Sequence, residues 1–203
     1  MSIEISPLQE DFIAELMNIA MGLAASSMSE MVDDEVRLSV PTIAFVSRQG
    51  AIEQFSGQVD GNFSGVSQKI NGVLGGELLL LFPSEKSLSV VEMMMQDTIP
   101  LQGLAELEQE ALCEVGNILL NAVVSSLADN IGERFESSLP AYIFGDCNDI
   151  MPDQASGDEV VLFLQVDFCF ANKSVDGYVV ILLDVDSIDL LLNKVDACIA
   201  RIA

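Results

Sequence analysis

Residues 11–18 read DFIAELMN, and residues 110–117 read EALCEVGN. The two segments lie 99 positions apart, and each contains an acidic residue, then Glu, then Asn at the same spacing. On an α-helix, residues separated by four and then three positions lie on one face. The spacing therefore predicts that each segment is helical and presents its acid, Glu and Asn as one stripe.

The similarity extends well beyond these two segments. The offset of 99 continues without a gap from residue 8 to residue 45, and it also places Pro41 on Pro140. Self-similarity at a fixed offset is the signature of an internal repeat. We therefore expect residues 1–203 to form a single domain built from two repeats, at about residues 6–98 and 104–203, with the stretch DTIPLQG as a short linker between them.

Each expected repeat opens with a long amphipathic stretch and continues with strand-like patterns. Apolar residues recur with a period of 3.6 in both opening stretches, and Ser6 before Pro7 is typical of a helix N-terminus. The remaining patterns predict a strand around each proline, an antiparallel hairpin and a closing helix in each half. The expected helices are 8–32, 84–96, 107–131 and 187–202, and the expected strand regions are 36–47, 57–68, 76–83, 135–145, 159–170 and 177–185.

These elements predict an α+β fold. Its two pseudo-symmetric helix-strand-helix halves share one antiparallel sheet, and the two long helices cover that sheet. The longest apolar runs are shorter than a bilayer span, so no membrane-spanning helix is expected. The acidic N-terminus has no basic region ahead of an apolar one, so it does not resemble a secretory signal, and a cytoplasmic location is expected.

The composition excludes several functional classes. The chain has 8 Lys and Arg against 32 Asp and Glu, a formal charge of −24, which argues against binding to nucleic acid. It has no His, so catalysis by Ser-His-Asp or Cys-His is excluded. The four cysteines have no C-x-x-C spacing, and no metal site or cofactor of its own is expected. Phosphate-binding glycine motifs are also missing from the sequence.

The acid, Glu and Asn stripe has a simple structural explanation, because a half-buried helix needs polar residues on its exposed face. Asn is nevertheless a poor residue for a helix interior, and here it recurs at one register. An Asn amide donates and accepts hydrogen bonds, so it can orient a water molecule but cannot deprotonate it. Orientation suffices where the electrophile is already activated, as in an acyl phosphate.

The spacing of these residues resembles the pattern of a known family. The pattern of Asp or Ser, three residues, Glu, two residues, Asn, then 22 residues and Pro is similar to that of the CheC family of chemotaxis phosphatases and its relatives CheX and FliY. Asp11, Glu15, Asn18 and Pro41 fit this pattern fully. Glu114, Asn117 and Pro140 fit it at the same spacings, whereas Glu110 departs from the usual Asp or Ser.

The resemblance implies a phosphatase that hydrolyses the phosphoaspartate of a CheY-type response regulator, in chemotaxis or related two-component signalling. It implies catalytic roles for Asn18 and Asn117, which would align the attacking water, and for Glu15 and Glu114, which would pair with a Lys of the regulator. Asp11 and Glu110 would support docking of the regulator, and Pro41 and Pro140 would be structural. Mg²⁺ would be bound by the regulator.

Two features bear on the relative strength of the two expected sites. Glu110 is one methylene longer than Asp, so the second site is expected to be the weaker. Gly116 precedes Asn117 where the larger Met17 precedes Asn18, which favours the second site.

Two other functions remain open. A non-catalytic adaptor could bind a response regulator or a CheD-type deamidase through the same stripe, although docking alone does not require the Asn twice. A flagellar switch component of the FliY type is the other alternative, and it would be expected to carry a further assembly domain.

Overall fold

The computed structural model describes residues 5–58, 61–95, 104–151, 160–170, 173–183 and 185–202. Within these residues the strands form a seven-stranded sheet in which all pairs are antiparallel. The strand order is β1 (Val36–Ser47), β6 (Val160–Phe170), β7 (Lys173–Leu183), β3 (Gly76–Pro83), β2 (Phe63–Gly72) and β4 (Phe135–Ser137), and β5 (Ala141–Gly145) also pairs with β2. The predicted α+β fold with a shared antiparallel sheet is confirmed.

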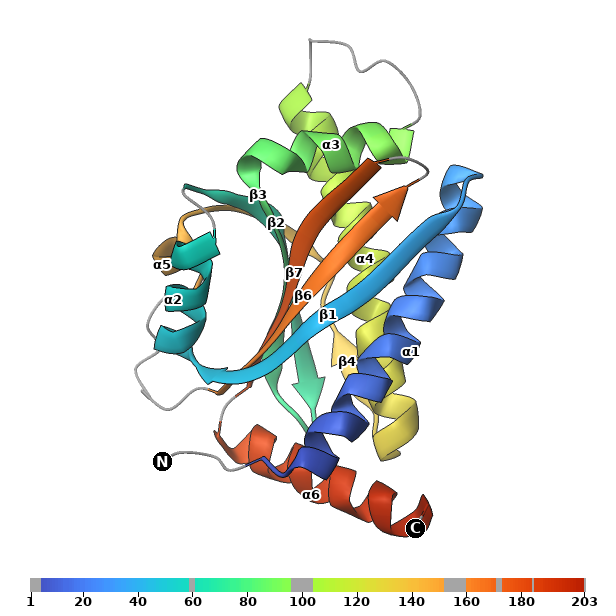
Figure 1. The fold of residues 1–203 in the computed structure, drawn as a ribbon, viewed down its shortest axis with the longest axis vertical. Coiled ribbons are helices and arrows are strands. Elements are labelled where there is room, and N and C mark those ends of the chain that lie inside the picture. Colours follow the sequence, from blue (N-terminus) through green and yellow to red (C-terminus); the bar gives the residue numbers. More distant parts are fainter. Residues whose placement is uncertain are drawn as a thin grey trace.

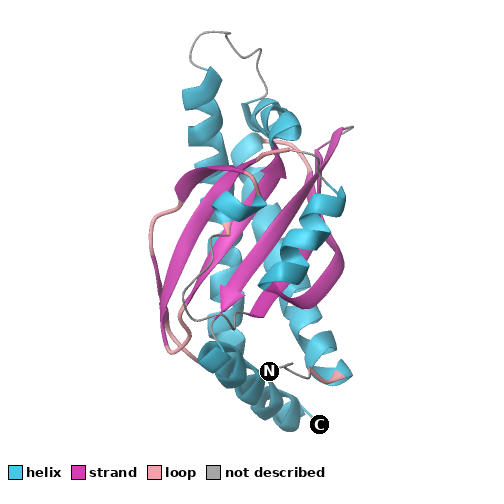
Figure 2. Cartoon of the chain, turned by 90° about the vertical axis from the view of Figure 1, so that its left-hand side faces the viewer, coloured by secondary structure: helices cyan, strands magenta, loops and turns pink. Residues whose placement is uncertain are grey.

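The helices lie on both faces of this sheet. The long helices α1 (Pro7–Val32) and α4 (Leu104–Ile131) run side by side on one face, with α3 (Ser84–Met95) and α6 (Val185–Ile202) at their ends, as Figure 1 shows. The opposite face carries the shorter helices α2 (Arg48–Gln58) and α5 (Cys147–Ile150), and Figure 2 views the sheet from that side. The sequence patterns predicted the long helices but neither α2 nor α5.

Helix α1 begins where the sequence predicted. Ser6 forms a capping box with Gln9, since the Gln9 backbone N–H donates to Ser6 Oγ and the Ser6 backbone N–H donates to Gln9 Oε1. Pro7 occupies the first turn, where its missing N–H costs nothing. The helix ends at Asp33, whose φ of 50° is in the left-handed region that stops helix propagation.

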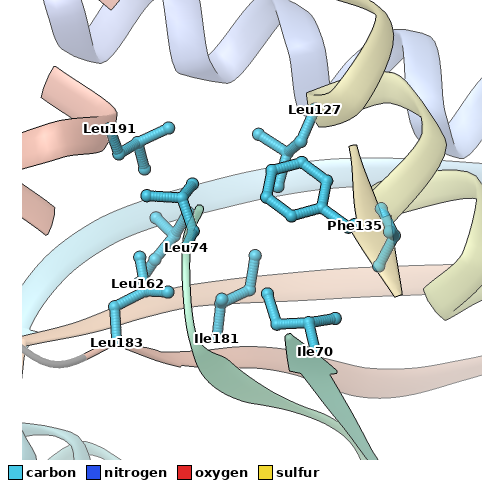
Figure 3. Close-up of a pocket in the computed structure, with 9 residues that line it drawn as sticks. Ile70, Leu74, Leu127, Phe135, Leu162, Ile181, Leu183 and Leu191 are labelled. Atoms are coloured by element: carbon cyan, nitrogen blue, oxygen red, sulfur yellow. The ribbon is translucent and has the colours of Figure 1, made fainter. Parts of the chain in front are cut away.

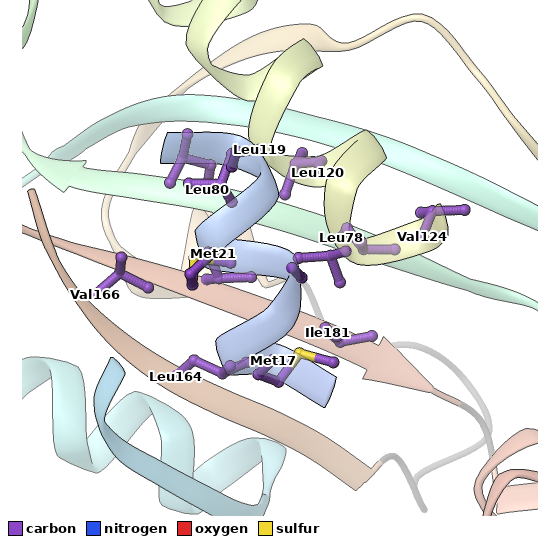
Figure 4. Close-up of a cluster of buried hydrophobic side chains, with 14 of the residues drawn as sticks. Met17, Met21, Leu78, Leu80, Leu119, Leu120, Val124, Leu164, Val166 and Ile181 are labelled. Atoms are coloured by element: carbon purple, nitrogen blue, oxygen red, sulfur yellow. The ribbon is translucent and has the colours of Figure 1, made fainter. Parts of the chain in front are cut away.

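The sheet is buried on both faces. In β3 the leucines alternate, so Leu78 and Leu80 contact the core beneath the long helices while Leu79 and Leu81 contact a second core around Phe55 of α2. Figure 4 shows the first of these cores, where α1 and α4 place methionine and leucine side chains on the sheet. A strand covered on both faces needs apolar residues at every position, which explains the continuous run LLLL.

In the middle of the sheet, two residues that are 99 positions apart in the sequence lie opposite each other. Strands β3 and β7 pair with Leu80 directly opposite Val179, and the elements before and after them follow the same order in both halves. The predicted linker lies outside the described residues. The assignment of one domain with two repeats stays a prediction.

The two prolines lie at irregular points of the sheet. Pro41 lies within β1, where the pairing with β6 shifts register between Ser39 and Thr42. Pro140 lies between β4 and β5, so the strand predicted at 135–145 is interrupted there. Because proline has no backbone N–H to donate to a neighbouring strand, such interruptions are its usual positions in a sheet.

Two helices of the described chain, Pro7–Val32 and Ala105–Ile131, are long and apolar enough to cross a membrane by length and composition alone. The sequence prediction considered only continuous apolar runs and did not identify them. Both helices have one face buried in the core, as core helices of globular proteins do, so this evidence for membrane insertion is weak.

Candidate functional site

The first stripe lies on the outer face of α1. Asp11, Glu15 and Asn18 are exposed, while Ile13 and Met17 between them are buried against the sheet. None of the three exposed side chains forms a hydrogen bond or ion pair with another described residue. Their carboxylates and amide are therefore available to a partner.

Apolar and small residues continue this stripe along α1. Ile19 and Leu23 are 43% and 54% exposed, and they lie four residues apart, so they are neighbours on the helix surface. Between them lies Gly22, where an added Cβ would meet no atom within 4 Å. The face that carries Asn18 is therefore partly apolar and open, a combination that suits contact with another protein.

The second stripe lies on α4 and is less open. Glu110 and Glu114 are exposed, but Asn117 is only partly exposed. Asn121, one turn further on, donates a hydrogen bond from Nδ2 to Asn117 Oδ1 at 2.9 Å. The two predicted sites therefore share their residue types and spacing but differ in the freedom of the Asn amide.

The residues that precede the two Asn side chains point into the core. Met17 is fully buried, and a Cβ on Gly116 would lie 2.1 Å from Val66 Cγ2. Because both positions face the sheet and not the open side of the helix, the expectation that Gly116 favours the second site has no support from the structure. The small size of Gly116 lets α4 approach β2 closely.

All charged residues of the two long helices are acidic. Residues 7–32 and 104–131 contain no Lys or Arg, so the faces around both stripes attract cations.

Cys113 precedes Glu114, and its thiol pKa is raised by burial, an effect partly offset by a hydrogen bond with the Tyr142 backbone. Cys113 is therefore a protonated thiol at neutral pH and a weak nucleophile.

The described residues contain no group of three or more His, Cys, Asp or Glu side chains able to hold a metal ion. An apolar pocket lies beneath the other end of α4, between the β2–β3 hairpin and α6 (Figure 3). Leu127, Phe135 and Leu191 are among its lining residues, and none of the stripe residues lines it. The stripes themselves offer carboxylates, which can bind a cation, and an amide, which can orient a small molecule.

Comparison with known proteins gives a consistent result. A family model described as the CheC-like family matches residues 8–44, which include the first stripe and Pro41. A curated relative, the CheY-P phosphatase CheC of Bacillus subtilis, is 25% identical over 65% of this chain and 64% of its own length, so the match spans less than two thirds of that relative. The crystal structure of Thermotoga maritima FliY matches with a TM-score of 0.78 and 20% identity over 97% of this chain and 100% of that chain.

The chain is similar to CheC-like proteins in residues 8–44 and in its fold.

Other CheC-like folds are also similar. A chain of the FliM–SpeE complex from H. pylori has a TM-score of 0.70 and 11% identity over 96% of this chain and 97% of that chain. A chain of the CheX–CheY–BeF3–Mg²⁺ complex from Borrelia burgdorferi has a TM-score of 0.51 and 18% identity over 84% of this chain and 97% of that chain. At such low identity these structures support the fold alone.

The structure gives the position of each predicted residue but does not test its role. The roles assigned to these residues all stay predictions: catalytic for Glu15, Asn18, Glu114 and Asn117, partner-binding for Asp11 and Glu110, and structural for Pro41 and Pro140. Sequence reasoning missed Asn121. The available signal was the position of Asn121, four residues after Asn117 and so one helical turn away. In the first half, Gly22 occupies the corresponding position after Asn18.

Proposed function

We propose that this CheC-like protein hydrolyses the phosphoaspartate of a CheY-type response regulator, with Asn18 and Asn117 positioning the attacking water. The observation that carries the proposal is the exposed group of Asp11, Glu15 and Asn18 on a helix without cations. The relative named CheY-P phosphatase and the complex of a CheX with CheY support the class of substrate.

The chemistry of the reaction fits these residues. The oxygen of water attacks phosphorus while the bond from phosphorus to the aspartyl oxygen breaks, which yields inorganic phosphate and the free Asp carboxylate of the regulator. The loose transition state requires positioning more than a strong base, and an Asn amide supplies positioning. Mg²⁺ held by the regulator would offset the phosphoryl charge.

Glu15 and Glu114 would anchor the regulator. A surface carboxylate pairs with an ammonium group such as the Lys of a receiver active site, and such pairs gain strength as docking removes water. Asp11 and Glu110 would add attraction at the edge of each contact. The exposed Ile19 and Leu23 beside Asn18 would supply apolar contact area.

The test is the rate of phosphate loss from a phosphorylated CheY-type regulator of the same organism, with Mg²⁺. The intact protein should accelerate the loss, and the double variant Asn18→Ala with Asn117→Ala should lose roughly two orders of magnitude of that acceleration. The single variants assign the activity to the two sites. Asn193→Ala, which removes an exposed Asn from α6, is the matched control and should leave the rate unchanged. Acceleration that survives in the double variant would exclude the mechanism.

A non-catalytic adaptor is the second candidate. The FliM structures share this fold, and they include a FliM–SpeE complex and a FliG–FliM complex. In this role the acidic stripes would bind a response regulator or a CheD-type deamidase without hydrolysis. Binding of the phosphorylated regulator with no acceleration of phosphate loss would favour this function. A cytoplasmic location is expected for either role, since the regulator would be found there.

A further inference from the structure

A chain of side-chain amides lies behind Asn117. Gln68 of β2 is buried, and its Nε2 donates to the backbone oxygen of Ser138 at 2.8 Å and to Asn121 Oδ1 at 3.1 Å. Asn121 Nδ2 in turn donates to Asn117 Oδ1 at 2.9 Å. Three amides therefore connect the interior of the sheet to the candidate site.

The direction of this chain is fixed by its inner end. The carbonyl oxygen of Ser138 only accepts, so Gln68 must turn Nε2 toward it, because a flipped amide would bring two oxygens together. Asn121 must then turn Oδ1 toward Gln68, and a second donor, Ser137 Oγ, approaches the same oxygen at 3.3 Å. Gln68 Oε1 has no partner within the described residues, a cost that the two donated bonds offset.

Because Asn121 offers Oδ1 inward, its Nδ2 faces outward and meets Asn117 Oδ1. We propose that Asn121 is a positioning residue that holds the Asn117 amide in one orientation, with Nδ2 directed toward the bound regulator. This inference rests on the proposed function. Asn117 then presents two N–H donors to the anionic phosphoryl group and its attacking water, and one Oδ1 lone pair remains free.

The first half has no such chain. Gly22 lies 99 positions before Asn121 and carries no side chain. At the first site, Val166 corresponds to Gln68. Val66 pairs with Tyr142, and Leu164 pairs with Ile43, which lies 99 positions before Tyr142. Val166 follows Leu164 by two residues, as Gln68 follows Val66. Val166 is fully buried and apolar, so the Asn18 amide is left to be oriented by the partner.

The activity test uses Asn121→Asp in the full chain carrying Asn18→Ala, so that phosphate loss from the phosphorylated regulator reports the second site. Aspartate keeps the size of the side chain and still accepts from Gln68, but it cannot donate to Asn117 Oδ1. The Asn117 amide should flip, and the rate should fall by about tenfold or more. Asn130→Asp is the matched control, because Asn130 of α4 also donates to a residue four positions earlier, and it should leave the rate unchanged.

A second readout does not depend on activity. In NMR spectra of the unbound protein, the Asn117 side-chain NH₂ should exchange rapidly with water, and in Asn121→Asp it should shift and become protected as it donates to the carboxylate. If Asn121→Asp fails to fold, Asn121→Ala should lower the second-site rate by about threefold to tenfold.

The outcomes separate the two proposals. A parent protein that does not accelerate phosphate loss would overturn the proposed function, while the NMR signals would still decide the orientation of Asn117. A second-site rate and Asn117 signals that are unchanged in Asn121→Asp would overturn the positioning role of Asn121.

Discussion

Asn18 and Asn117 follow a Glu at the same spacing on α1 and α4, but their surroundings differ. The Asn18 side chain is exposed, has no partner among the described residues and is followed one turn later by Gly22. The Asn117 side chain is partly exposed and is held by Asn121. Matching residue types therefore do not produce matching sites, because the residues behind each Asn decide how freely its amide rotates.

The helices also differ in how they meet the sheet. Met17 fills the space between α1 and the strands, close to Leu164 in Figure 4. At the corresponding turn of α4, Gly116 leaves no space, and Val66 lies against the helix backbone. One interface is filled by a long side chain and the other by close approach of the backbone. Substitutions at these two positions should therefore separate the two halves.

The largest expected effect comes from Met17→Ala. Truncation of a fully buried Met leaves a cavity, and we expect a loss of about 2–5 kcal/mol in the free energy of unfolding. Urea denaturation measures the loss, with the exposed Ser26→Ala on the same helix as the control. A loss below about 1 kcal/mol would mean that α1 settles onto the sheet as α4 already does.

Gly116→Ala should have the next largest effect. The new methyl would lie 2.1 Å from Val66 Cγ2, so α4 or β2 must shift, and overpacking of this kind costs about 1–3 kcal/mol. The melting temperature should fall, and the second-site rate should fall with it because Asn117 and Asn121 would move away from Gln68. Relief of the destabilisation by Val66→Ala in the double variant would identify the contact. If Val66→Ala adds its own full cost instead, the close approach is not the cause.

The parts of the fold that follow from local patterns were predictable. The period of 3.6 and the Ser6–Pro7 start predicted α1, and the polar and Gly-containing turns between strand-like stretches predicted the two hairpins, whose pairing is confirmed. Helix α2 was missed because RQGAIEQFSGQ contains few large apolar residues. Its buried face consists of Ala51, Ile52 and Phe55. Phe55 packs edge-on against Phe63, Phe163 and Tyr178 from distant strands.

The candidate site was predictable to a similar depth. Helical spacing was enough to place Asp11, Glu15 and Asn18 on one exposed face. The hydrogen bond from Asn121 to Asn117 could be suspected from their four-residue spacing. The contribution of Gln68 could not, since it depends on the pairing of β2 with β4 and on the Ser138 carbonyl, which only the folded sheet brings together.

The smallest expected effect is that of Gly22→Ala, the same substitution as Gly116→Ala but on the other long helix. An added Cβ at Gly22 meets nothing within 4 Å, and Ala is favoured over Gly in a helix interior by about 0.5–1 kcal/mol. The protein should therefore become more stable, whereas Gly116→Ala makes it less stable. Chemical denaturation of both variants against the parent measures the two signs.

The functional consequence of Gly22→Ala should have the opposite sign to its effect on stability. Gly22 lies one turn from Asn18 on the face proposed to meet the regulator, so a methyl there would hold the partner's backbone away. In a chain that carries Asn117→Ala, we expect the KM for the phosphorylated regulator to rise by about threefold to tenfold while the protein is more stable. An unchanged KM would show that the partner does not approach α1 at Gly22, and the docking face would then have to lie closer to Asp11.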